Sequence, residues 1–139
     1  MDIASLARHL PVLFCAALVS ILFIQSGLDK VFDWKGNLGW LTGHFAKTFV
    51  AGTVPIMLAM ITVMELASGI LSAVGIIYWF ATGSTSLMFW AGALGAASIA
   101  ALFFGQRVAK DYPGAAVLVP YFILMIILML LATPYAAAR

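Results

Sequence analysis

Four long apolar segments, at residues 10–28, 54–80, 87–104 and 115–132, constrain this chain more than any other feature. A helix needs about 20 apolar residues to cross the hydrocarbon of a bilayer, and all four segments are close to or above that length. Charged residues form only 9% of the chain, against about a quarter in soluble proteins, so they are too few to coat a water-facing surface. We therefore expect an all-α integral membrane protein, a bundle of four transmembrane helices.

The size and the charge of the chain limit its organisation further. Four spans use most of the 139 residues, so we expect a single membrane domain over residues 1–139. A net charge of +2 is too weak and too scattered for nucleic-acid binding. Cys15 is the only cysteine, which excludes an intrachain disulfide and a multi-cysteine metal site, and we interpret it as a buried structural thiol.

The connection between the first two segments, residues 29–53, has a pattern of its own. Leu38, Leu41, Phe45 and Phe49 recur at helical spacing, and Trp34 and Trp40 accompany them. This pattern predicts a short amphipathic or re-entrant helix at the membrane surface.

Prolines and tryptophans help to place the ends of the spans. Pro11 and Pro55 are expected in the first turns of the first and second helices, where a missing N–H is tolerated. Trp79 and Trp90 flank the short second connection, so we expect them at the membrane interface opposite Trp34 and Trp40.

The distribution of basic residues predicts an orientation. The long first connection and the third connection hold most of them: Lys30, Lys35, Lys47, Arg107 and Lys110. The opposite side holds Arg8 and Arg139. Because basic residues in short connections resist translocation, both termini are expected outside the cytoplasm, in a bacterial inner membrane.

Glu65 is the most unusual residue, because it interrupts the second apolar segment about eleven residues from its start. An ionised side chain near mid-membrane costs at least about 2.5–3.5 kcal/mol. Ser68, Gly69, Ser72 and Gly75 continue its helical face, so this stripe is expected to face protein. Two interpretations remain open: a proton, ion or ligand site, or a protonated glutamate bonded across helices for structural specificity.

The end of the first span supplies the candidate partners of Glu65. Gln25, Ser26 and Lys30 approach the membrane face where the second span begins. Glu65 lies about 15 Å below Pro55 at the rise of an α-helix, so Lys30 reaches it only if its helix extends inward or tilts. The depth of Gln25 in the first span therefore makes it easier for Gln25 than for Lys30 to contact Glu65.

Other chemical sites find little support in the sequence. His9 and His44 are expected at opposite membrane faces, so they cannot hold one haem or metal together. No nucleotide-binding or Ser-His-Asp pattern is present. We expect no metal site and no catalysis by the chain on its own.

Small residues predict where helices pack closely. Steps of three or four residues between small side chains let helix backbones approach one another in lipid. The positions expected to do so are Gly27, Gly69, Gly75, Gly92, Ala93, Ala97 and Ala101. Packing within the chain is the first interpretation of the alanine stripe, and a dimer or partner interface is the alternative.

Between Gly105 and Gly114, Arg107 and Lys110 could contact lipid head groups or a partner, or belong to a solvated turn.

Two short motifs resemble the DoxX family of small four-helix membrane proteins. The segment Phe23–Phe32 is similar to the family's Gly-x-x-Lys ending of the first helix, through Gly27 and Lys30. The segment Met64–Gly75 is similar to its Glu-x-x-x-Gly helix, through Glu65 and Gly69. The resemblance covers about residues 10–80 and implies a membrane protein associated with redox systems such as quinone-coupled oxidation and terminal oxidases, without an agreed catalytic role for these positions.

These observations lead to three functional hypotheses. The first is an accessory subunit packed among other integral membrane subunits of a respiratory or other electron-transfer complex, with quinone or lipid in a cavity near Glu65. The second is a small proton- or ion-coupled transporter that uses Glu65 as its coupling carboxyl group. The third is a membrane subunit of a quinone-linked oxidoreductase.

Overall fold

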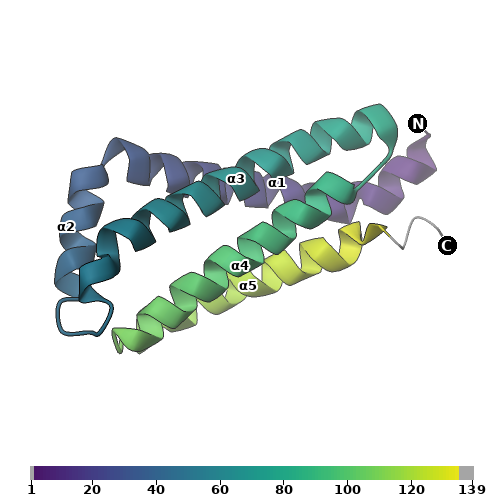
Figure 1. Cartoon of the computed structure of the whole chain (residues 1–139). Coiled ribbons are helices and arrows are strands. Elements are labelled where there is room, and N and C mark those ends of the chain that lie inside the picture. The colour runs from purple at the N-terminus through teal and green to yellow at the C-terminus, as the bar shows by residue number, and fades with distance from the viewer. Residues whose placement is uncertain (1, 135–139) are drawn as a thin grey trace.

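The computed structural model describes residues 2–134, and these residues form a bundle of α-helices (Figure 1). The helices are α1 (Ile3–Phe32), α2 (Trp34–His44), α3 (Val54–Thr82), α4 (Ser86–Val108) and α5 (Tyr112–Ala132), with a short 3-10 helix, η1 (Ala51–Thr53), before α3. Four of them, α1, α3, α4 and α5, are long and apolar enough to cross a membrane. The expected all-α bundle of four transmembrane helices is confirmed.

The first helix is longer than its apolar segment predicted. Asp2 caps α1 by accepting a hydrogen bond from the backbone N–H of Ser5 at 2.7 Å, so the helix starts one to two turns earlier than expected. Pro11 consequently lies inside α1 and not in its first turn, which corrects the prediction. At the other end the helix continues through Lys30 to Phe32.

The third connection is shorter than expected, because helices occupy most of it. α4 continues to Val108 and α5 starts at Tyr112, so only residues 109–111 separate them. Asp111 caps α5 through a hydrogen bond that the Gly114 N–H donates at 3.0 Å. Pro55 lies at the start of α3, as predicted.

The short helix α2 lies across the end of the bundle where α1 ends and α3 begins (Figure 1). Leu38 and Leu41 are half-buried on it, and Phe45 is buried directly after its last residue. Phe49, in contrast, lies in the following turns with 81% of its surface exposed. A short surface helix was therefore predicted correctly, but its apolar face ends one turn earlier than the sequence pattern.

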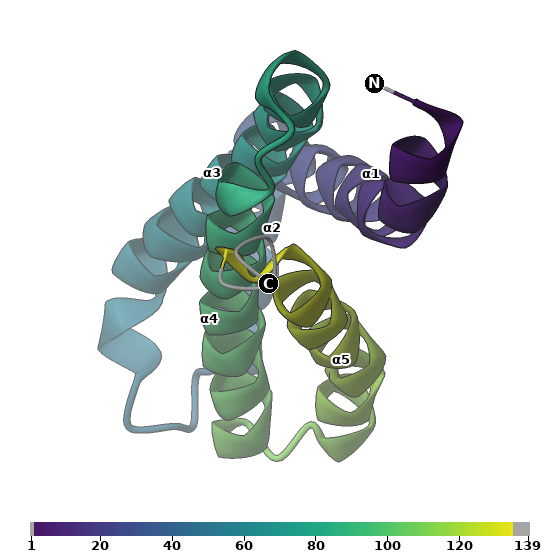
Figure 2. The same ribbon diagram turned by 90° about the vertical axis from the view of Figure 1, so that its right-hand side faces the viewer.

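Successive helices of the bundle pack on one another: α1 on α3, α3 on α4, and α4 on α5 (Figures 1 and 2). α1 and α5 meet over a shorter stretch, which closes the bundle only in part. Phe23, Met88, Met125 and Leu128 fill the centre and are fully enclosed. Large apolar side chains also cover the outside, where lipid is the matching solvent.

Trp79 lies at the predicted end of the bundle, but it is buried among the helices. Only 3% of its surface is exposed, and its ring packs 4.8 Å from that of His9, between ring centres. Trp90, by comparison, is 60% exposed. Both tryptophans belong to the same end of the bundle, but Trp79 lies on the inner face of α3 because it continues the buried stripe at the spacing of a helix.

The predicted alanine stripe on α4 is also only partly correct. Gly92 is buried, and a side chain at this position would meet Met129 and the backbone of Met125. Ala93 is half-buried, however, whereas Ala97 and Ala101 are exposed. Gly95 makes the close contact instead: a Cβ atom there would lie 2.7–2.9 Å from Met125, Phe23 and Ser68.

Candidate functional site

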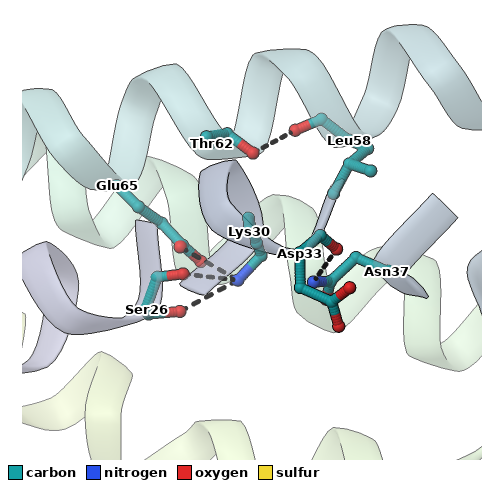
Figure 3. Close-up of polar contacts among 7 residues, drawn as sticks. All are labelled: Ser26, Lys30, Asp33, Asn37, Leu58, Thr62 and Glu65. Atoms are coloured by element: carbon teal, nitrogen blue, oxygen red, sulfur yellow. Dashed lines mark hydrogen bonds and ion pairs between the residues drawn. The ribbon is translucent and has the colours of Figure 1, made fainter. Parts of the chain in front are cut away.

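An ion pair joins α1 to α3 in the interior of the bundle. The Lys30 ammonium lies 3.1 Å from the Oε2 atom of Glu65, which is 2% exposed (Figure 3). Lys30 also donates to the Oγ atom of Ser26, one turn earlier, at 2.9 Å. The carboxylate and the ammonium neutralise one another, so their insertion into the membrane costs less than that of a lone charge.

Two glycines bring the backbones close at this point. A Cβ atom on Gly27 would lie within 2.6 Å of the side chain of Leu66, and one on Gly69 would lie 2.8 Å from Ile24. α1 and α3 therefore touch over the two turns of α1 that lead up to the ion pair. The four positions that carry the family resemblance, Gly27, Lys30, Glu65 and Gly69, meet in this single contact.

Gln25 is not the partner of Glu65, contrary to the prediction from helix depth. Its side chain is exposed on the outside of the bundle. Five residues along a helix correspond to a rotation of about 140°, so Gln25 and Lys30 point in different directions, whereas Ser26 and Lys30 are only about 40° apart. The depth estimate treated each helix separately, but Gly27 lies beside Leu66, and this register brings Lys30 to the level of Glu65.

Ser68 and Ser72 are fully buried on the same face of α3 as Glu65, as predicted. They bond to other helices and not to the ion pair. Ser68 donates to the carbonyl oxygen of Ala91 in α4, and Ser72 donates to that of Ala16 in α1, each at 2.8 Å. Their role is to fasten helices together, and the polar site itself consists of Glu65, Lys30 and Ser26.

A cavity of about 260 Å³ lies below α2, beside the ion pair. Lys30 is the one charged residue in its wall, and the polar wall residues are Asn37 and Gln106. The remaining wall is apolar or aromatic and comes from α2 and the turn after it, α3, α4 and α5: Trp40, Leu41, Phe45, Val54, Met57, Leu58, Ile61, Ala101, Leu102, Gly105 and Leu118. An apolar cavity with one fixed cationic group is suited to an amphiphile whose head group accepts hydrogen bonds.

A polar contact that the sequence analysis did not find holds the end of α2 against the turn between α4 and α5. The Nε2 atom of His44 lies 2.7 Å from the Oε1 atom of Gln106 and 3.7 Å from the Oδ2 atom of Asp111. Trp40 stacks on the His44 ring at 4.5 Å between ring centres. His44 is the last residue of α2, and Asp111 is the cap at the start of α5. Their positions at helix ends on the same face were the only sequence signal that they lie close together.

The basic residues of the third connection lie at the same end of the bundle. Arg107 packs over the ring of Tyr112, 4.4 Å from its centre, and Lys110 occupies a left-handed conformation with a φ of 60°. Lys110, Lys47 and His44 line a second hollow at this end. His9 lies at the opposite end, near Trp79, so the two histidines are separated as expected.

Within residues 2–134, no cluster of three histidine, cysteine, aspartate or glutamate side chains could hold a metal ion. Arg139, which contributed to the predicted orientation, lies outside the described residues. Comparisons of the chain with protein-family models, with curated proteins and with solved structures gave no match.

Proposed function

We propose that this chain is a DoxX-like accessory subunit of an electron-transfer complex in the bacterial inner membrane, and that its cavity below α2 binds the head group of a quinone or lipid. The observation that carries the proposal is the Lys30 ammonium, which is held by Glu65 and Ser26 in the wall of a largely apolar cavity.

The geometry of Lys30 supports binding of a hydrogen-bond acceptor. An ammonium group has three donors. Two of them face Glu65 and Ser26 at 3.1 and 2.9 Å, and the carbonyl oxygen of Ser26 is farther away, at 3.5 Å. The donor that makes this longest contact can instead turn to a quinone carbonyl or a lipid head-group oxygen.

The apolar wall supports a ligand that enters from the membrane. The side chains of Leu58, Ile61 and Leu102 offer a surface for an isoprenoid or acyl chain, and Trp40 offers an aromatic face. Binding of this kind stores or positions a lipid-soluble molecule for a partner. Electron transfer itself is assigned to the other subunits of the proposed complex.

Binding can be tested with the purified chain in lipid nanodiscs and a short-tailed benzoquinone as the probe. Ala101→Phe places a large ring at the cavity wall without touching the ion pair, and we expect it to abolish binding. Ala97→Phe, one turn earlier on the exposed face of α4, is the matched control and should bind like the wild type. Equal binding by both variants would contradict the assignment of this cavity.

The association with a complex needs a second experiment. After gentle solubilisation of the native membrane, mass spectrometry and a visible absorption spectrum of the co-migrating material should reveal haem- or flavin-bearing subunits. A colourless, homogeneous particle would contradict the accessory role and favour proton- or ion-coupled transport.

The transport alternative has its own test. Loss of transport in Glu65→Gln would support it, and full transport by this variant would exclude it. Quinone turnover by the purified chain would instead favour the oxidoreductase hypothesis.

A further inference from the structure

The outward face of α1 carries a regular seam of large side chains. Its members follow one another at alternating steps of four and three residues, and all of them are exposed: Phe14, Leu18, Ile21, Gln25, Leu28 and Phe32. Such steps are the pattern with which one helix packs along another in a left-handed coiled coil.

Gln25 is the only polar residue of this seam, and it lies on the outside of the bundle at a depth near the middle of α3. Its neighbour Ile24 contacts Gly69, near the middle of α3. The side-chain hydrogen bonds described for α1 involve Ser5, His9, Ser20, Ser26 and Lys30, and none involves Gln25. An amide that faces hydrocarbon without a hydrogen-bond partner is unfavourable, so this position indicates a protein contact.

The outward face of α3 is an internal comparison. It has a similar series of exposed residues at helical steps, and every one is apolar: Ile56, Met60, Val63, Ile70, Val74 and Ile77. These apolar side chains need no hydrogen-bond partner, so contact with lipid accounts for all of them. The amide of Gln25 therefore distinguishes α1 from a face that only contacts lipid.

We propose that the seam of α1 is a homodimer interface, in which Gln25 of one copy pairs with Gln25 of a second copy across a two-fold axis along the membrane normal. An amide carries both donors and acceptors, so two identical amides satisfy one another. A two-fold interface requires such self-complementary chemistry, because each residue on the axis meets its own copy.

The shape of the surrounding surface fits a second α1. A shallow hollow on this face is lined by α1 residues alone, including Ile21, Ile24 and Leu28, and can receive side chains from a neighbouring helix. A single polar residue within an apolar seam fixes the register of two helices. Asp29 also lines this hollow, one turn from Gln25 and toward the end of α1, so its carboxylate lies at the margin of the proposed contact.

Disulfide crosslinking of the full chain in lipid vesicles tests the contact. In a Cys15→Ala background, Ile21→Cys and Leu28→Cys should form crosslinked dimers. Val63→Cys and Ile70→Cys, on the outward face of α3, are the matched controls and should remain monomeric on the same time scale. The proposal would be overturned if the α3 variants formed crosslinked dimers to the same extent as the α1 variants.

The role of the amide is tested by dilution of the protein in lipid, with energy transfer between labelled copies as the measure of dimerisation. Gln25→Leu should raise the dissociation constant of the dimer by about three- to twenty-fold, the range of single interhelical hydrogen bonds in membranes. Gln25→Asn, which keeps the amide, should retain most of the affinity. An unchanged dimer in Gln25→Leu, a monomeric wild type, or crosslinks from position 21 to a different protein in native membranes would each overturn it.

Discussion

The ammonium of Lys30 lies 3.1 Å from the carboxylate of Glu65, so the last turn of α1 is tied to the interior of α3. The contact is strengthened by Ser26 and enclosed by the close approach of the two helices at Gly27 and Gly69. Lys30 also lines the cavity below α2, so it belongs both to the ion pair and to the cavity wall.

Removal of the two partners of this ion pair should have unequal effects on stability. Lys30→Met leaves the enclosed carboxylate of Glu65 without a counter-charge and should reduce the free energy of unfolding by about 3 kcal/mol. Glu65→Gln should cost less, because Lys30 borders the cavity and keeps its hydrogen bond to Ser26. Thermal unfolding in detergent, followed by circular dichroism, measures both changes.

The double variant Lys30→Met with Glu65→Leu serves as the decisive comparison for the ion pair. It removes both charges together and should recover most of the stability lost in Lys30→Met. Lys35→Met, an exposed lysine on α2, is the control and should stay within about 0.5 kcal/mol of the wild type. A double variant that is less stable than either single variant would show that the pair is not the stabilising unit.

Gly95 should tolerate a larger side chain much less well than Ala97. Gly95→Val forces a side chain into Phe23, Ser68 and Met125, and we expect a loss of about 2–3 kcal/mol or failure to fold. Ala97→Val adds the same kind of side chain to an exposed position and should be close to neutral. Expression and thermal stability of the two variants measure the difference, and equal stability would contradict the observed rotation of α4.

Loss of the Ser72 hydroxyl should weaken the contact between α1 and α3 by a small, measurable amount. Ser72→Ala removes the hydrogen bond to the carbonyl oxygen of Ala16 and should cost about 0.6 kcal/mol, with about 1.7 kcal/mol as the upper end. Thr82→Ala is a suitable control, because Thr82 is exposed and its hydroxyl bonds only to Tyr78 and the adjacent Ser84, not to another helix. Equal unfolding free energies of Ser72→Ala and the wild type would argue against the bond.

His44 should determine how firmly α2 covers the cavity. His44→Ala removes the bond to Gln106 and the stacking on Trp40, so the amide protons of residues 34–44 should exchange faster, while those of α3 and α4 keep their protection. Thr42→Ala, which loses only a bond within α2, is the control. Hydrogen exchange with mass spectrometry reports both regions, and unchanged exchange of α2 in His44→Ala would contradict a fastening role.

The elements of this protein were predictable because hydropathy alone defines what can cross a membrane. The four spans, the surface helix after α1 and the position of Pro55 at the start of α3 agree with the sequence patterns. So does the burial of the stripe that contains Glu65, since a carboxylate and several serines in an apolar segment are most favourable when they face protein.

The contacts between these helices depended on their rotation and register, which only the tertiary structure decided. In a soluble protein an apolar face marks the core, but in a membrane both the core and the lipid-facing surface are apolar. The sequence therefore did not distinguish the exposed Ala97 from the enclosed Gly95, or place Trp79 in the core. For the same reason, the choice of Lys30 and not Gln25 as the partner of Glu65 followed from how α1 lies against α3.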